Sequence, residues 1–147
     1  MDRHEVTQLI LQNKVNKNLT WKGLANQLGL SKEWVTAGCL GQMTFTPSQA
    51  QIVVDYFELP TAALVWLTQV PYKGSLPEAV PTDPLIYRFY ELVQVYGTTF
   101  KELIHEEFGD GIMSAIDFKM DLEREKNEAG DRVHITLSGK FLPYKTY

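Results

Sequence analysis

The chain of 147 residues is long enough for one moderate domain or two small ones. Its composition, with 44% hydrophobic and 22% charged residues, is that of an ordinary globular protein and argues against a disordered chain. The net charge of -4 argues against a protein that neutralises many phosphates, and a single cysteine excludes an internal disulfide.

The sequence gives no sign of a membrane or export segment. No apolar run approaches the ~20 residues that a membrane-crossing helix needs. Residues 1–6 lack the basic start and the apolar core of a signal peptide. Together with the lone Cys39, these features lead us to expect a cytoplasmic protein without a membrane partner.

The first half of the chain has the apolar spacing of three and four residues that is typical of short helices. Thr20 and Ser31 are placed to cap two of these helices, and Gly29 lies between them, where a left-handed residue would end the first. A further helix begins after Thr46, and one more short helix follows it. Helix, short turn with glycine, and helix form the helix-turn-helix pattern. We therefore predict an all-α, repressor-like domain over residues 1–75.

The charge of this domain argues against DNA as its partner. Residues 1–70 carry five basic and five acidic side chains, so their net charge is zero. The second helix of the pattern, after Ser31, starts with one lysine and one glutamate among apolar or small residues. A recognition helix instead offers Arg, Lys, Asn or Gln to the base edges. We favour packing or assembly as the role of this domain, and a helix-turn-helix transcription regulator is the alternative.

A proline-rich segment separates the two halves. Residues 70–84 contain four prolines and one glycine, so regular structure cannot persist there. We place the domain boundary inside this segment, which gives a second domain over residues 76–147.

The second domain begins with a helix that is apolar on nearly every side. Asp83 and Pro84 form a strong helix start, and the residues that follow are mostly apolar, so this helix should be buried. Gly97 is expected to end it. Thr99 with Glu102 then matches a capping box that begins a second helix.

Beyond the helices the apolar period changes to two, which indicates strands. A glycine-punctuated loop over residues 109–114 precedes a strand over 116–123, and residues 126–131 supply the turn to a returning strand that ends at Gly139. Two short helices and one hairpin bury too little apolar surface for a domain of ~70 residues. We therefore predict an α+β protein whose hairpins pair between chains in an obligate oligomer.

Metal and cofactor patterns are missing from the sequence. His4, His105 and His134 are far apart, and His105 lacks the second histidine four residues on that a zinc-protease helix needs. No glycine pattern matches a nucleotide-binding loop. Cys39 has no base near it in sequence, which favours a structural thiol over a nucleophile. From these patterns we expect neither a metal site nor a nucleotide-binding loop.

Three polar residues of the second domain remain as candidates for chemistry. Arg88 and Glu91 lie three residues apart inside the apolar helix and hence on one face. A guanidinium presents a planar fork of donors that suits a small anion, and Glu91 could orient that fork. Ser114 follows the glycine loop, where its hydroxyl could meet an anion. From spacing alone, an ion pair that only holds an assembly together and a plain loop serine explain these residues at least as well.

The sequence around these candidates resembles a known family. Residues 81–119 look like the signature of cyanase (cyanate hydratase, also called cyanate lyase), and they read PTDPLIYRFYELVQVYGTTFKELIHEEFGDGIMSAIDFK. Residues 135–143, which read ITLSGKFLP, are similar to the C-terminus of that family, and the N-terminal half resembles its repressor-like helical domain. The likeness spans essentially the whole chain and departs mainly in the proline-rich linker and in the hairpin turn.

The resemblance implies a function and an assembly. The family decomposes cyanate to ammonia and carbon dioxide through carbamate, with bicarbonate as co-substrate and without a metal or organic cofactor. Its catalytic Arg, Glu and Ser fall on Arg88, Glu91 and Ser114. It forms a homodecamer of five dimers, with hairpins interlocked within each dimer and sites at subunit interfaces. A structural oligomer without catalysis is the remaining alternative.

Overall fold

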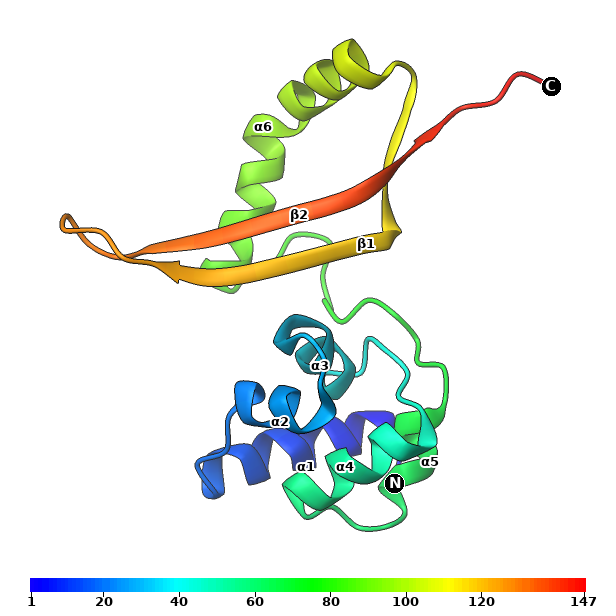
Figure 1. The fold of residues 1–147 in the computed structure, drawn as a ribbon, viewed down its shortest axis with the longest axis vertical. Helices are drawn as coiled ribbons and strands as arrows, with labels where there is room; N and C mark the ends of the chain where they lie inside the picture. The colour runs from blue at the N-terminus through cyan, green and yellow to red at the C-terminus, as the bar shows by residue number, and fades with distance from the viewer. The chain divides into compact units, whose positions relative to one another are not determined.

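The computed structural model describes residues 1–147, which divide into two compact units, Met1–Ser75 and Leu76–Tyr147 (Figure 1). The first unit contains only helices, and the second combines one helix with a two-stranded antiparallel sheet. The mixed helix and sheet content confirms the predicted α+β class.

The first unit is built from five helices, and a side chain caps the N-terminus of four of them. The side chain of Thr20 accepts from Gly23 N, and that of Ser31 accepts from Trp34 N, so both predicted N-caps are confirmed. Gly29, with φ of 66°, ends the first of the two capped helices in the left-handed region, as predicted. The helices are α1 (Arg3–Asn16), α2 (Trp21–Leu28), α3 (Lys32–Cys39), α4 (Pro47–Phe57) and α5 (Ala63–Thr68).

The apolar core of the chain lies entirely in this first unit. Phe45 and Phe57 are its largest buried side chains, and Trp34 and Trp21 respectively pack edge to face against them. Burying one such large apolar side chain stabilises the fold by roughly 1.5–3 kcal/mol. The buried apolar residues are Val6, Ile10, Leu24, Ala25, Val35, Cys39, Phe45, Ala50, Val53, Val54, Phe57, Leu59, Ala63 and Leu67.

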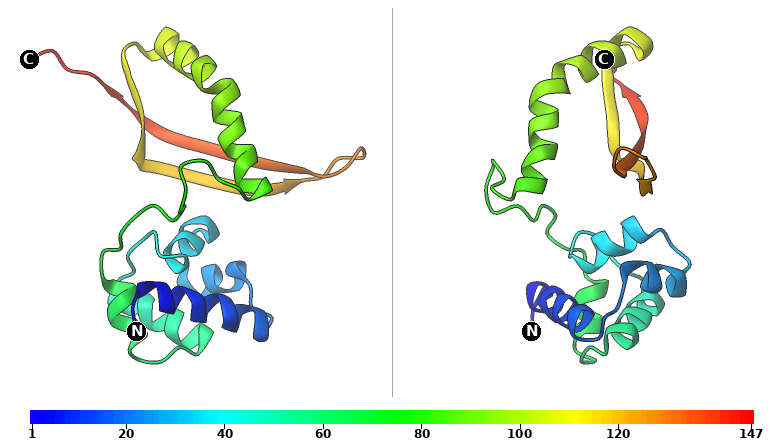
Figure 2. Two further views of the ribbon diagram at one scale, coloured as in Figure 1. Left: turned by 180° about the vertical axis from the view of Figure 1, so that it is seen from behind. Right: turned by 90° about the vertical axis from the view of Figure 1, so that its left-hand side faces the viewer.

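The second unit begins with one long helix, α6 (Pro84–Phe108), where two helices were predicted. Its start is as predicted, because the Asp83 carboxylate accepts from Leu85 N and Ile86 N, each at 2.9 Å. The predicted break at Gly97 is wrong. The helix runs through it and bends along its length (Figure 2), and the predicted capping box lies inside the continuous helix. One glycine inside a helix costs only ~1 kcal/mol relative to alanine, which a helix of this length tolerates.

A β-hairpin completes the second unit. It consists of β1 (Gly111–Glu125) and β2 (Arg132–Pro143), so β1 extends beyond both predicted ends and β2 extends beyond its predicted end at Gly139. The predicted glycine loop is therefore mostly strand. The pairing register breaks between Met113 and Phe118 on β1, so that residues 114–117 are unpaired where β2 has the single residue Lys140. Such a bulge bends the strand, and β1 turns sharply at this place in Figure 1.

The prediction that α6 is buried does not hold within one chain. No residue of α6 is buried, and no helix of the chain is long and apolar enough to cross a membrane. An exposed apolar surface of this extent marks an interaction surface. The large apolar side chains that α6 exposes are Leu85, Ile86, Tyr87, Phe89, Leu92, Val93, Val95, Tyr96, Phe100, Leu103 and Phe108.

Candidate active site

Arg88 and Glu91 form an ion pair on the first half of α6. Nη1 of Arg88 lies 3.2 Å from Oε2 of Glu91, which confirms that the two side chains share one face. The guanidinium carbon also lies 5.8 Å from the centre of the Tyr87 ring. In one chain the Arg88 and Glu91 side chains are 67% and 49% exposed, so the guanidinium keeps donors free for an anion.

Ser114 is the one polar side chain that the chain buries. It lies at the bulge of β1, where its Oγ accepts hydrogen bonds from Ile116 N at 3.0 Å and from Asp117 N at 2.9 Å. A serine hydroxyl has two lone pairs and one proton. Because both lone pairs are engaged, the proton is the part of the hydroxyl that remains to be donated to a ligand.

The three predicted site residues are only partly brought together by one chain. Arg88 and Glu91 contact each other, whereas the hydrogen bonds of Ser114 stay within its own turn. Arg88 and Glu91 belong to α6 and Ser114 to β1, and no hydrogen bond joins the two groups. One chain thus presents an exposed anion-binding pair and a separate oriented hydroxyl.

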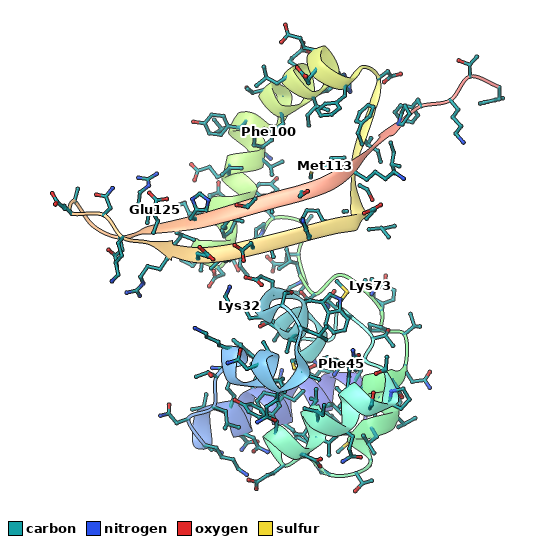
Figure 3. All side chains as sticks on the ribbon, in the orientation of Figure 1. Lys32, Phe45, Lys73, Phe100, Met113 and Glu125 are labelled. Atoms are coloured by element: carbon teal, nitrogen blue, oxygen red, sulfur yellow. The ribbon has the colours of Figure 1, made fainter.

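The hairpin places two further cations near the bulge, which the sequence pattern did not reveal. A hollow of about 500 Å³ lies on the hairpin, and Lys119, Lys140 and Asp117 are among the residues that line it. Lys140 faces the bulge because of the shifted register, and register follows from pairing between strands. The alternation of residues along a single strand therefore does not predict that Lys140 lies near the bulge. Figure 3 shows the side chains of the hairpin and labels Met113, which precedes the bulge.

The histidines of the second unit have structural partners. Nε2 of His105 lies 3.2 Å from the carbonyl oxygen of Gly111, which ties the end of α6 to the start of β1. His134 pairs with Glu125 at 3.1 Å on the exposed hairpin. The chain contains no group of three or more His, Cys, Asp or Glu side chains arranged to hold a metal ion.

Cys39 is a buried thiol in the first unit. Burial raises the pKa of the Cys39 thiol to about 12, partly opposed by the positive charge of Arg3. Burial lowers the pKa of Arg3, whose guanidinium donates to the carbonyl oxygen of Gly38. A thiol with a raised pKa carries little thiolate at neutral pH and is a poor nucleophile, in line with the structural role predicted for it.

We expect Cys39 to be protected from thiol reagents in the folded protein. At about pH 8, iodoacetamide should label it at least about 100-fold more slowly than in the unfolded chain, since the thiolate is the reacting species. The raised folded-state pKa also means that its contribution to stability is complete below about pH 9 and is lost as the pH rises toward about 12. Mass spectrometry of labelled protein measures the protection. Rapid labelling of the folded protein would contradict the buried placement.

The whole chain is similar to known proteins. Residues 3–71 match the family model described as "Cyanate hydratase, N-terminal", and residues 78–146 match "Cyanate lyase C-terminal domain". The chain is 71% identical to the cyanate hydratase of Methylibium petroleiphilum and 68% identical to that of Dechloromonas aromatica, over all of both chains in each case. A crystal structure of cyanase from T. urticae shares 40% identity with a TM-score of 0.81, covering 94% of this chain and 96% of that one.

These likenesses define an enzyme of the lyase class, built from an N-terminal helical unit and a C-terminal unit of one helix and a hairpin. The chain belongs to the cyanate hydratase family.

Proposed function

We propose that this chain catalyses the bicarbonate-dependent decomposition of cyanate to ammonia and carbon dioxide. The observation that carries the proposal is the 71% identity over the full length to a cyanate hydratase, with Arg88, Glu91 and Ser114 all present. The same likeness favours the enzyme over the transcription regulator, whose DNA-binding surface would need a basic excess that residues 1–70 lack.

Arg88 binds the two anions in this proposal. Cyanate and bicarbonate are both negative, so their approach is opposed by charge repulsion. A guanidinium offsets that repulsion and holds both reactants through its fork of donors, which converts an encounter of two anions into an oriented step. The ion pair with Glu91 fixes the orientation of the fork while leaving other N–H groups of Arg88 free.

Ser114 donates a hydrogen bond to the adduct of bicarbonate and cyanate in this proposal. A bicarbonate oxygen attacks the cyanate carbon, and the resulting mixed adduct loses carbon dioxide from its bicarbonate part to leave carbamate. Carbamate then breaks down to ammonia and a second carbon dioxide, and the whole reaction takes up two protons. The free proton of the Ser114 hydroxyl donates to an anionic oxygen or nitrogen of the adduct, where charge accumulates. In this proposal Glu91 orients Arg88 and also carries one of the protons.

The site is completed by other chains in a homo-oligomer, which we propose to be a decamer of five dimers with interlocked hairpins. Two observations support this assembly. The second unit exposes most of its large apolar side chains, and Arg88 has no contact with Ser114 within the chain. The single, buried Cys39 fits a cytoplasmic location, and the proposed reaction requires neither a metal nor an organic cofactor.

Ammonia release from cyanate tests the proposed reaction. With cyanate and bicarbonate together, the purified protein should release ammonia. Two molecules of carbon dioxide should appear for each molecule of ammonia. In buffer depleted of carbon dioxide and bicarbonate, the release should stop. No release with both substrates present would refute the proposal, and undiminished release without bicarbonate would refute the mechanism.

Ser114→Ala should lower kcat by about 100-fold, the usual cost of losing one donor to a developing anion. Oligomer mass should not change, because the alanine side chain fits the space of the serine. Steady-state kinetics and light scattering measure both quantities. Ser138→Ala on β2 is the matched control, since this serine lines the hairpin hollow and lies outside the proposed chemistry. A fully active Ser114→Ala would remove this residue from the mechanism.

A further inference from the structure

We propose that Gly139 is a positioning residue for Ser114. Because residue 139 has no side chain, β2 can pack closely against the bulge of β1. This close packing fixes the backbone that orients the serine hydroxyl. This inference rests on the proposed function, because it gives Gly139 a role only through a catalytic Ser114.

The contact is between Gly139 and the peptide of Ser114 itself. A Cβ atom at residue 139 would lie under 3.0 Å from the backbone oxygen of Ser114, a separation that real Cβ atoms essentially never show. It would also lie 2.6 Å from Cγ of Met113. The Cγ atom of Met113 can move when its side chain changes rotamer, whereas the carbonyl of Ser114 can move only with its peptide.

Gly139 is required for space and not for backbone conformation. The glycines with positive φ are Gly29, Gly41, Gly74, Gly109 and Gly130, and Gly139 is not among them. Alanine can therefore adopt the backbone of residue 139 without strain in φ. The effect of an added methyl group on activity then reports only on how closely the two strands pack at this position.

Movement of the Ser114 peptide would reach the hydroxyl directly. The Oγ of Ser114 is held by Ile116 N and Asp117 N, which lie in the same turn as the displaced peptide. The register places Gly139 opposite Phe118, at the end of this turn, so the crowding acts on the turn from the facing strand. A misplacement of ~1 Å at a reacting group costs about 100-fold in rate.

The first test is Gly139→Ala. We expect kcat to fall by about 100-fold while the KM for cyanate changes little, since Arg88 rather than Ser114 binds the anion. Oligomer mass should be unchanged. Gly111→Ala is the matched control: its Cβ would also crowd β2, at Leu142 O and Phe141, but it does not touch Ser114. We expect this variant to keep most of its kcat. An equal loss in both variants, or an active Gly139→Ala, would overturn the proposal.

A double variant separates positioning from general damage. If Gly139 acts through Ser114, then adding Gly139→Ala to Ser114→Ala should lower kcat by less than about 3-fold further, because the hydroxyl it positions is already gone. Losses that multiply would assign Gly139 an independent role and contradict the inference. Unchanged activity in Ser114→Ala would instead refute the proposed role of Ser114. Failure of the role of Gly139 and failure of the role of Ser114 therefore give different results.

Met113→Ala covers the case in which Gly139→Ala does not assemble. Met113→Ala with Gly139→Ala removes the clash with the Met113 side chain and keeps the clash with the Ser114 carbonyl. We expect this double variant to assemble and to stay about 100-fold below Met113→Ala in kcat. Recovery of kcat would show that the crowding acts through Met113. Failure to assemble would place Gly139 in folding, and either result overturns the proposal.

Discussion

Replacing Arg88 by lysine is expected to lower activity by about 100-fold or more while leaving the oligomer intact. Lysine keeps the positive charge but presents a compact ammonium in place of a planar fork, so it cannot hold two anions in fixed relative orientation. It also loses the geometry of the 3.2 Å contact with Glu91. Initial rates of ammonia release, with light scattering on the same sample, measure the two parts of this expectation.

Arg124→Lys provides the control for that substitution. Arg124 is an exposed arginine on β1 whose Nη1 lies 3.5 Å from Oδ2 of Asp131, so it too belongs to a surface ion pair. Exposed pairs of this kind contribute little to stability, and Arg124 lies outside the proposed site. We expect its activity to match that of the unmodified protein. Substantial activity in Arg88→Lys would contradict anion binding by the guanidinium fork.

Val93→Asp is expected to dissociate the assembly and to abolish activity with it. Val93 is 60% exposed on α6 in one chain, and we place this helix at subunit interfaces. Burying an unpaired carboxylate there would cost several kcal/mol, repeated at every equivalent contact. Analytical ultracentrifugation should show smaller species, and ammonia release should fall to background.

Val15→Asp makes the same chemical change on the other unit. Val15 is 77% exposed on α1, which contributes its own buried side chains to the core of the first unit. Its substitution should leave both mass and activity unchanged. An intact, active Val93→Asp oligomer would show that this part of α6 faces solvent.

Features that depend on neighbours in sequence were predictable. The N-caps at Thr20, Ser31 and Asp83 follow from hydrogen bonds within three residues, and the structure contains each of them. The shared face of Arg88 and Glu91 likewise follows from helical spacing. Gly97 misled the prediction because the cost of one glycine is small beside the continuous hydrogen bonding of a 25-residue helix.

Features that depend on pairing between strands were not predictable. The bulge after Met113 arises from the register of β1 on β2, so the sequence did not reveal that Ser114 would be buried with both lone pairs engaged. The close packing of β2 on β1 at Gly139 also depends on this register. In our proposal α6 is buried by further copies of the chain, and a single sequence does not specify how such copies are arranged.

We propose that α6 is both an interface and half of a site whose other half comes from another chain. Co-expression of Arg88→Lys and Ser114→Ala subunits, followed by purification of mixed oligomers, tests this arrangement directly. If Arg88 and Ser114 of one site come from different chains, some mixed sites contain both unmodified residues. Ammonia release should then rise well above that of either variant alone. Mixed oligomers no more active than the two parents would show that each chain forms its own site.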